Sequence, residues 1–346
     1  MIRTLNFQAM GCQMLAALDT PAENGPARLE RVPVWFEAWE QALSRFREDS
    51  ELNRLNRSAG VDTPVSRALW SVFAAARDAE RRSGGLVTPA VLEALLAAGY
   101  DRSFAELAGT ETAPGEHAPQ ATVSPEASAV AQAAASAKAT ASAEAARRPV
   151  PAPSSTEAFT AEAGGLSAVR LDPRRRSLRL PPGLRLDFGG VAKGWAAHEA
   201  ARRLKLYGPA LVDAGGDIAI SGLQSGGQPW PVGVADPFEP DRDLDVLHLG
   251  RCGVATSGRD YRRWQQGGAW KHHIIDPRTG RPAETDLISV TVIAPDVMEA
   301  EMAAKRALIL GSRAGLAWIE ASPTLAALLI LDDGRRLDSR RFIRYL

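Results

Sequence analysis

The sequence predicts an α+β fold, and three observations support this prediction. Strands, helices and hairpins follow one another without the regular alternation that a doubly wound parallel sheet requires. Two apolar runs each end in a glycine turn that carries an acidic residue. A long segment of low complexity interrupts the pattern. With 346 residues the chain can bury a sizeable core, and we expect a single domain spanning residues 1–346.

The N-terminal segment predicts a strand and then a helix. Residues 5–18 alternate loosely and break at Met10 and Gly11, which indicates a strand with a turn or bulge inside it. From residue 28 to residue 45, apolar side chains recur at steps of three and four, which is typical of a helix. These side chains are Leu29, Val32, Trp35, Phe36, Trp39 and Leu43.

Proline and glycine residues delimit the next two helical segments. The first covers residues 66–83, after Pro64 and before the pair Gly84–Gly85. The second covers residues 89–98 and ends at Gly99.

Residues 109–163 differ in composition from the rest of the chain. They consist largely of Ala, Ser, Thr, Pro and Glu, and Phe159 is the only aromatic residue among them. Such a composition cannot bury enough apolar surface to offset the entropy lost on ordering. We therefore expect a disordered Ala/Ser/Pro-rich insertion within the domain, with folded sequence resuming at Ala168.

The segment after the insertion combines strands with one helix. Residues 169–180 predict a hairpin, because the run Pro-Arg-Arg-Arg separates two apolar stretches. A helix is expected to follow Lys193 and to end near residue 208. Strands are expected at 210–213 and 218–221, on either side of the second glycine turn.

The C-terminal part predicts a strand, a helix and a hairpin. The apolar strand ends at Pro295, and a helix is expected over residues 297–311. Residues 325–331 and 341–346 are expected to pair as a hairpin through the Asp-Gly turn at 333–334.

The two glycine turns indicate a ligand that contains phosphate. Residues 186–194 run from an apolar stretch through Gly189 and Gly190 to Lys193, and residues 212–217 form the second turn. Glycine permits positive φ and a close approach of backbone to ligand, and the lysine adds a positive charge for an anion. Backbone N–H groups in such turns can hold a phosphate. Neither turn matches the Walker A or dinucleotide-binding pattern.

Composition excludes several classes of protein. The chain has 41 basic and 41 acidic residues, so no overall field attracts nucleic acid or an anionic membrane. Cys12 and Cys252 are too few for a disulfide framework and are not spaced as a zinc site. No export signal and no stretch long enough to span a membrane is recognised. We therefore expect a cytoplasmic protein that neither inserts into membranes nor binds nucleic acid.

Four blocks of sequence, in order, carry a resemblance to a known family. The blocks are residues 44–56 (SRFREDSELNRLN), residues 187–194 (DFGGVAKG), residues 214–217 (AGGD), and residues 255–258 (ATSG) leading to 273–280 (HIIDPRTG). Their order and spacing resemble the ApbE family, the FAD:protein FMN transferases. The resemblance covers the whole chain except the low-complexity insertion.

The resemblance implies a fold, a reaction and its partners. The family has an α+β fold with a cleft for FAD, and Mg²⁺ bridges the pyrophosphate. It transfers FMN from FAD to a Thr or Ser hydroxyl of an acceptor protein and releases AMP. Two alternatives remain open: a protein that binds FAD but has lost transfer, and an FAD pyrophosphatase that yields FMN and AMP.

The resemblance also assigns roles to residues of the first two turns. Met10 and Gly11 match the segment beside the flavin, where Cys12 replaces the usual Thr and is either a buried substitute or a site residue. Asp217 either holds a ribose hydroxyl or caps its turn. The pyrophosphate and metal turn corresponds to Gly189, Gly190, Ala192 and Lys193, with the carbonyl of Ala192 as a metal ligand.

The last block supplies the proton-transfer candidates. A loop that contacts the nucleotide corresponds to Thr256, Ser257 and Gly258. His273 is the best candidate for proton transfer, because imidazole titrates near neutral pH and Asp276 follows within reach. His272 is expected to face the opposite way and to be structural. Lys193 and Asp276 complete the predicted catalytic set.

One departure from the family concerns the metal. The family presents Asp and, four residues later, Thr or Asp on one helix face, where Glu301 and Lys305 stand here. Glu301 could still bind a metal, but the ammonium of Lys305 cannot. Lys305 either replaces part of the metal's charge at the pyrophosphate or marks a site that binds flavin without transfer. Thr88 likewise stands where the family often has Asp.

Overall fold

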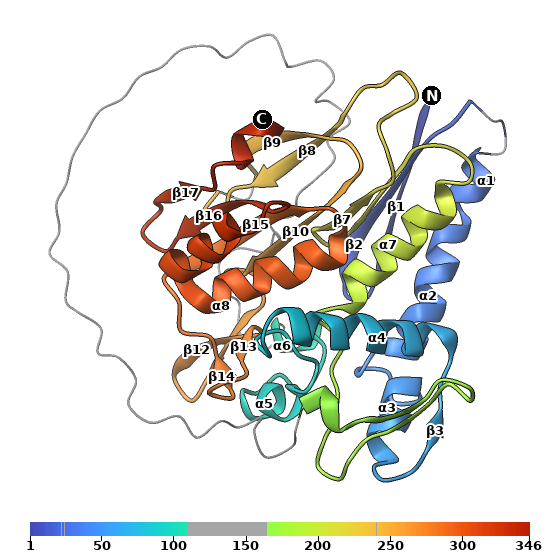
Figure 1. Ribbon diagram of the computed structural model, residues 1–346, viewed down its shortest axis with the longest axis vertical. Helices are drawn as coiled ribbons and strands as arrows, with labels where there is room; N and C mark the ends of the chain where they lie inside the picture. The colour runs from blue at the N-terminus through green and yellow to red at the C-terminus, as the bar shows by residue number, and fades with distance from the viewer. Residues whose placement is uncertain (22, 24, 109–164, 240) are drawn as a thin grey trace, which may run out of the picture.

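An antiparallel sheet of eight strands runs through the molecule in the computed structural model, which describes all residues except 22, 24, 109–164 and 240 (Figure 1). The strand order is β1-β2-β6-β7-β10-β15-β16-β17. Their bounds are β1 Ile2–Ala9, β2 Cys12–Asp19, β6 Ala210–Ala214, β7 Asp217–Ile220, β10 Cys252–Gly258, β15 Leu287–Ala294, β16 Ala326–Leu331 and β17 Arg336–Asp338. Helices pack on this sheet, which confirms the predicted α+β class.

Two tight hairpin turns lie side by side at one end of the sheet. Met10 and Gly11 join β1 to β2 with φ angles of 50° and 67°, and Gly215 and Gly216 join β6 to β7 with 67° and 90°. Positive φ at both central positions suits the twist of a two-residue hairpin. Because β2 pairs with β6, a Cβ atom at Gly215 would lie only 2.8 Å from Cβ of Cys12. The predicted break at residues 10–11 is therefore a turn between two strands, not a bulge in one.

Helices α7 (Ala192–Leu204) and α8 (Val297–Ala321) lie against one face of the sheet. The buried side of α8 is rich in alanine, which lets the helix backbone approach β10 and β15 closely. Gly311 has φ 79° and ψ 171°, so the backbone kinks there and helix resumes to Ala321. The helix predicted to end at Gly311 is thus extended by a second segment that the sequence analysis missed.

A helical layer packs on the N-terminal part of this core. It contains α1 (Gly25–Leu29), α2 (Arg31–Leu43), α3 (Glu51–Arg57) and α4 (Arg67–Arg82). Phe36 and Trp39 of α2 are buried, and the ring of Trp39 meets that of Trp195 edge-on, with centroids 5.3 Å apart. Ser66 caps α4 by accepting a hydrogen bond from the Leu69 amide at 3.2 Å. The predicted helix over 66–83 is confirmed, and the one over 28–45 is divided at Glu30.

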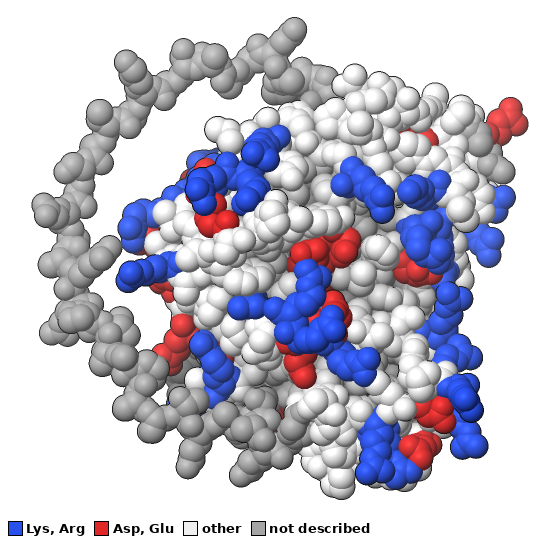
Figure 2. Space-filling model, in the orientation of Figure 1, with Lys and Arg blue, Asp and Glu red and all other residues white. Residues whose placement is uncertain are grey.

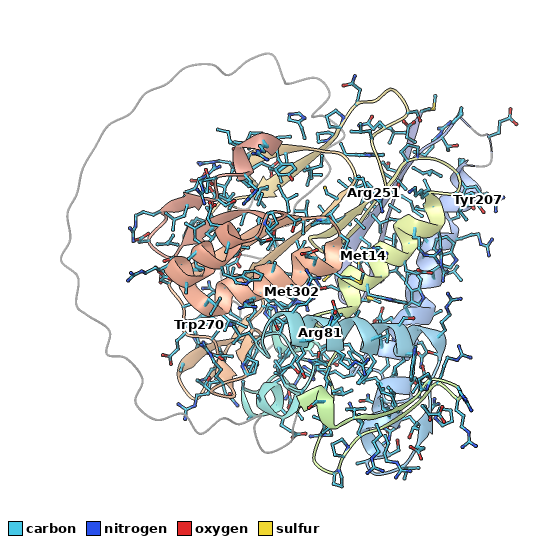
Figure 3. All side chains as sticks on the ribbon, viewed as in Figure 1. Met14, Arg81, Tyr207, Arg251, Trp270 and Met302 are labelled. Carbon is cyan, nitrogen blue, oxygen red and sulfur yellow. The ribbon has the colours of Figure 1, made fainter. Side chains whose placement is uncertain are left out.

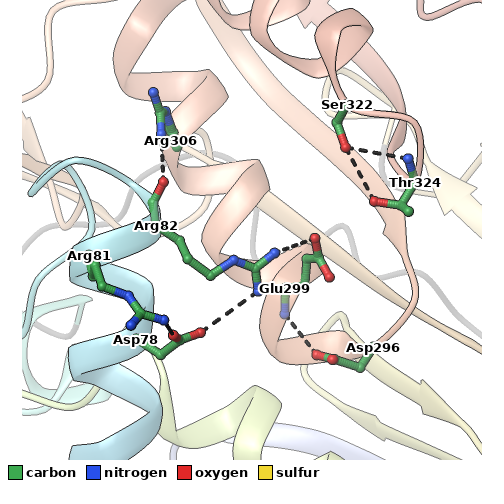
Figure 4. A network of polar contacts seen from close by, with 8 residues as sticks. All are labelled: Asp78, Arg81, Arg82, Asp296, Glu299, Arg306, Ser322 and Thr324. Carbon is green, nitrogen blue, oxygen red and sulfur yellow. Dashed lines mark hydrogen bonds and ion pairs between the residues drawn. The ribbon is translucent and has the colours of Figure 1, made fainter.

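A polar network ties α4 to α8 (Figure 4). Arg82 near the end of α4 pairs with Glu299 of α8, and its carbonyl accepts a hydrogen bond from Arg306 at 2.8 Å. Asp296 caps α8 by accepting from the Glu299 amide at 2.9 Å. Arg81 of α4 also pairs with Asp78 of the same helix. Figure 2 shows basic and acidic side chains close to one another on the face of the molecule that it draws.

A ribbon of two strands and a short helix cover the opposite face of the sheet. The ribbon is β8 (Trp230–Ala235) and β9 (Asp243–Leu249), and the 3₁₀-helix η2 spans Phe342–Tyr345. Trp230 and Phe342 are buried between these elements and the sheet. The strand predicted at 341–346 is therefore wrong, because β17 already pairs with β16 directly after the Asp-Gly turn.

Short elements complete the described part of the chain. They are α5 Leu92–Ala97, α6 Phe104–Ala108, η1 Gly165–Ala168, β3 Thr63–Pro64, β4 Arg170–Asp172, β5 Ser177–Arg179, β11 Arg263–Gln266, β12 Ala269–His272, β13 Ile275–Asp276 and β14 Arg281–Pro282. Strands β4 and β5 confirm the hairpin predicted at 169–180. The insertion predicted at 109–163 lies outside the described residues. Among those described, no helix is both long and apolar enough to cross a membrane.

Candidate functional site

A cavity of about 1080 Å³ opens at the end of the sheet that carries the two glycine hairpin turns. Its walls come from segments far apart in the sequence, including both turns, the start of α7, the end of β10 and the β11–β12 hairpin. Most of the predicted site residues line it: Met10, Gly11, Gly189, Gly190, Ala192, Lys193, Asp217, Thr256, Ser257, Gly258 and His273. Within the described part of the chain, the lining omits Asp276 and Glu301 but includes Cys12 and Lys305.

The turn at residues 187–191 places the N-terminus of α7 at the cavity. Asp187 accepts a hydrogen bond from the Gly189 amide at 2.6 Å, which shapes the turn. Gly189 and Gly190 do not adopt positive φ, so the turn does not use that freedom of glycine; both lie close to neighbouring side chains instead. A Cβ atom at Gly189 would lie 2.8 Å from the Asp187 carboxylate, and one at Gly190 would lie 3.0 Å from Cε of Lys305. The helix N-terminus and the exposed backbone together form a favourable surface for an anion.

Lys193 and Asp217 connect the two predicted glycine turns. The ammonium of Lys193 lies 2.5 Å from the carboxylate of Asp217, and both side chains are largely buried. Burial opposes the charge on Lys193, but Asp217, Cys12 and Glu301 raise its pKa above the ordinary value, so it stays positive at neutral pH. The carboxylate of Asp217 therefore pairs with the lysine ammonium. The residue that caps the turn at residues 214–217 is Asp213, whose carboxylate accepts a hydrogen bond from the Gly216 amide at 2.7 Å.

Asp213 makes stability depend on pH. Burial is the main cause that raises its pKa from 3.8 to about 7, against the hydrogen bond from Gly216. A raised pKa favours the folded state when the carboxyl is protonated, and this contribution is lost as pH rises through 7. Between pH 5 and pH 8 we expect the unmodified protein to lose about 2–3 kcal/mol of its free energy of unfolding that the Asp213→Asn variant does not lose. Urea unfolding of the unmodified protein and the variant at both pH values measures this difference. Equal losses in the two proteins would contradict the assignment.

Glu301 and Lys305 form the second lysine–carboxylate pair of the site. The Lys305 ammonium lies 2.9 Å from Oε1 of Glu301, whose side chain is only 2% exposed. The other oxygen, Oε2, has no hydrogen-bond partner in the described part of the chain and packs against α7, 2.5 Å from where a Cβ of Gly194 would stand. Glu301 thus lies beneath Lys305, and Lys305 faces the cavity.

These residues do not fit the Mg²⁺ site predicted at Ala192 and Glu301. One Glu301 oxygen already faces an ammonium and the other faces helix backbone. Ala192 is the first residue of α7, so its carbonyl belongs to the hydrogen-bond ladder of the helix. A divalent cation placed beside Glu301 would also be repelled by Lys305.

His273 follows β12 and lines the cavity, whereas its neighbour does not. Its Nδ1 lies 3.4 Å from the carbonyl of Arg262. Because a carbonyl can only accept, this contact favours the tautomer with the proton on Nδ1, in which Nε2 can accept a proton. Burial, with the charges of Arg262, His272 and Lys305, holds the pKa of His273 well below its ordinary value. Both ring nitrogens of His272 bond to backbone, at Ala283 and Ile274, which agrees with a structural role.

Asp276 lies apart from His273 in its interactions. Its carboxylate accepts hydrogen bonds from the Arg278 side chain, at 2.7 Å for the shortest, and from the Arg278 amide at 2.9 Å. Its carbonyl accepts from the Gly280 amide at 2.9 Å. These contacts shape the turn between β13 and β14, and among the described residues no hydrogen bond joins Asp276 to the imidazole.

The predicted nucleotide loop at residues 256–258 is the end of strand β10. Thr256 and Thr291 of β15 share a hydrogen bond between their hydroxyls at 2.9 Å, and Ser257 is buried. The resemblance to the family implied a loop here, but pairing with β15 holds these residues in the sheet. The strand ends at the cavity, so these residues still line it.

Several cavity residues were not predicted from the sequence. Arg262 donates to Sγ of Cys12 at 2.9 Å, so the thiol contacts a site residue instead of being only a buried filler. Arg45 pairs with Asp187 at 2.5 Å and stacks on the ring of Tyr100, 4.6 Å from its centroid. In the sequence, the only signal for Arg45 was that it lies within residues 44–56, one of the blocks that carry the resemblance to the family.

Aromatic side chains form a second wall of the cavity. The rings of Tyr100 and Trp264 have centroids 5.1 Å apart, and those of Phe104 and Tyr261 are 5.6 Å apart. Trp270, labelled in Figure 3, extends from the β11–β12 hairpin and is 50% exposed. A planar ring system could stack against such a wall.

Comparison with known proteins identifies the family. The model of the ApbE family matches residues 10–329. The chain belongs to the ApbE family. A relative from Treponema pallidum, an FAD:protein FMN transferase, is 29% identical over 338 residues, which cover 94% of this chain and 82% of that protein. A Vibrio cholerae protein of the same name is 32% identical over 193 residues, covering 54% of this chain and 57% of that one.

The fold of this ApbE family member is also shared with solved structures. The crystal structure of the ApbE protein from Thermotoga maritima superposes with a TM-score of 0.76 at 23% identity, and the match covers 100% of this chain and 99% of that one. At that identity the likeness concerns the fold. It supports the mixed arrangement of sheet and helices predicted from the sequence.

Proposed function

We propose that the protein transfers FMN from FAD to a Thr or Ser hydroxyl of an acceptor protein and releases AMP. The observation that carries this proposal is that one cavity holds both an anion-binding surface and an unprotonated imidazole. The surface consists of the α7 N-terminus, Lys193 and Lys305, and the imidazole is that of His273. The relatives named FAD:protein FMN transferase support the same reaction. We predict a cytoplasmic location from the sequence alone.

The chemistry is a phosphoryl transfer. The hydroxyl oxygen of the acceptor attacks the phosphorus of the FMN half, and the bond from that phosphorus to the AMP oxygen breaks. The proton of the hydroxyl passes to Nε2 of His273. The ammonium groups of Lys193 and Lys305 neutralise charge on the pyrophosphate and on the leaving AMP. Asp276 has no part in this scheme, because its carboxylate is bonded to Arg278.

The remaining lining divides into two parts. We assign the flavin ring to the aromatic wall beside Met10 and Gly11, where the amide of Met10 is held by Glu40 at 2.7 Å. Thr256, Ser257 and Gly258 would contact the nucleotide from the end of β10. The sheet and the hairpin turns hold these groups in fixed positions, which favours a pre-organised site.

Incubation with FAD and a candidate acceptor protein tests the proposal. Transfer yields an acceptor whose mass increases by that of the FMN moiety, together with one AMP per flavin attached. Free FMN and AMP without a labelled acceptor would support the pyrophosphatase alternative. Bound FAD without either product would support the alternative of a flavin-binding protein that has lost transfer.

Lys193→Ala is expected to weaken FAD and leave riboflavin almost unchanged. The lysine addresses the phosphates, which riboflavin lacks, and a hydrogen bond to a charged group contributes about 1.5–3 kcal/mol. That range corresponds to roughly 10- to 150-fold in affinity for FAD. Fluorescence titration with both ligands measures the effect, and equal losses for FAD and riboflavin would disprove the phosphate assignment.

A further inference from the structure

Lys305 occupies a defined position between a buried carboxylate and the cavity. Its ammonium rests on Glu301 at 2.9 Å, and its Cε packs on the backbone of Gly190 in the first turn. The side chain is 17% exposed, against 2% for Glu301. Of the two, only Lys305 is among the described residues that line the cavity. The carboxylate therefore holds the ammonium at the turn that faces the ligand.

Lys193 repeats this arrangement from the neighbouring helix. Its ammonium lies on Asp217 at 2.5 Å, with side-chain exposures of 18% for the lysine and 3% for the aspartate. Both lysines contact the same turn region, since Lys193 follows it in sequence and Lys305 packs on Gly190. The site thus contains two lysine–carboxylate pairs whose ammonium groups face one cavity.

Each ammonium retains donors for a ligand. An ammonium group has three N–H donors, and the contacts above use one of them in each lysine. The carboxylates balance the lysine charges, so a bound pyrophosphate meets positive groups whose positions are already fixed. A divalent cation would need oxygen ligands at the place where Glu301 already faces an ammonium.

We propose that Lys193 and Lys305 together bind the pyrophosphate of FAD where a divalent cation would otherwise do so, and that FAD binding to this protein therefore requires no Mg²⁺. This inference rests on the proposed function, because it takes FAD as the ligand. It assigns Glu301 as a positioning residue for Lys305. It also accounts for the lysine that departs from the family pattern on α8.

The first test measures FAD affinity of the unmodified protein. Fluorescence titration is carried out in EDTA and again in millimolar Mg²⁺. We expect the two dissociation constants to agree within about twofold, since the ammonium pair is present in both conditions. FAD binding that is lost in EDTA and restored by Mg²⁺ would overturn the inference.

The second test removes the ammonium. Lys305→Gln is expected to weaken FAD in EDTA by roughly 10- to 100-fold and to leave riboflavin unchanged. Lys205→Gln, at an exposed position after α7, is the matched control and should bind FAD normally. FAD curves for Lys305→Gln that superimpose on those of the control would overturn the inference.

A double variant separates ligand binding from folding. Lys305→Gln alone leaves Glu301 buried without its partner, so the protein could unfold for that reason. Glu301→Gln with Lys305→Gln removes both charges and should keep the fold while losing the same FAD affinity. Normal FAD affinity in this folded variant would overturn the inference.

The two proposals fail on different measurements. Metal-independent FAD binding without any labelled acceptor would contradict the proposed transfer and support the binding inference. If labelling of the acceptor depends strictly on Mg²⁺ and FAD binding is lost in EDTA, the proposed transfer is supported and the binding inference is contradicted.

Discussion

Replacing His273 by glutamine is expected to lower the rate of flavin transfer by about 10²- to 10⁴-fold, the range for loss of a positioned general base. Glutamine retains a donor for the Arg262 carbonyl but cannot accept the proton of the attacking hydroxyl. FAD affinity should change little, because we assign the binding of the phosphates to Lys193 and Lys305 and not to His273. Single-turnover transfer to a saturating acceptor, together with FAD titration, measures the two effects separately.

The neighbouring histidine provides the control for this variant. His272→Gln should affect stability more than the chemical step, since both nitrogens of His272 bond to backbone. The pH profile gives a second check. Because the pKa of His273 lies well below its ordinary value, protonation of this residue should reduce the rate only at pH values well below 6.5. Full transfer by His273→Gln would exclude it as the base.

Asp187→Ala is expected to destabilise the protein by about 3–5 kcal/mol, the usual cost of leaving one member of a buried ion pair without its partner. The Arg45 side chain is 6% exposed and that of Asp187 is 10% exposed, with 2.5 Å between guanidinium and carboxylate. The change also removes the acceptor for the Gly189 amide. Urea unfolding gives the free energy of unfolding of the variant and of the unmodified protein.

An exposed pair provides the comparison for Asp187. Asp62 pairs with Arg179 on the surface, where both side chains are more than one third exposed. Asp62→Ala should have a much smaller effect, because water replaces the lost partner. If Asp187→Ala and Asp62→Ala changed the free energy of unfolding equally, the buried pair would not stabilise the fold as argued.

Local signals in the sequence were sufficient for many of the elements. Helix α4 was predicted with its ends, because Pro64 precedes its start and a glycine pair follows its last turn. The β4–β5 hairpin and the strands around residues 214–217 were likewise predicted, since apolar stretches flank turn residues. Elements without such local signals were missed or misassigned: the β8–β9 ribbon, the helix segment after Gly311 and the strand that contains Thr256.

The sequence by itself determined the family and part of the cavity lining, namely the glycine turns, Lys193, residues 256–258 and His273. The two glycine turns, Lys193 and His273 stand in short motifs whose residue types already indicate an anion and a proton acceptor. Tertiary structure alone decided which of these residues meet. It placed Lys305 on Gly190, 115 positions away in the chain. The bond from Arg278 to Asp276 is by contrast local, between residues two positions apart, and the sequence analysis did not predict it.

The physical reason is that local structural signals and buried sites depend on residues at different separations along the chain. A cap, a turn or an amphipathic helix depends on residues a few positions apart, so it is visible in the sequence. The charge balance of a buried site depends on which side chains from distant strands and helices share one volume. The pair of Glu301 and Lys305 could therefore be seen as an i, i+4 pair, but only its burial against α7 decided that the lysine, not the carboxylate, lines the cavity.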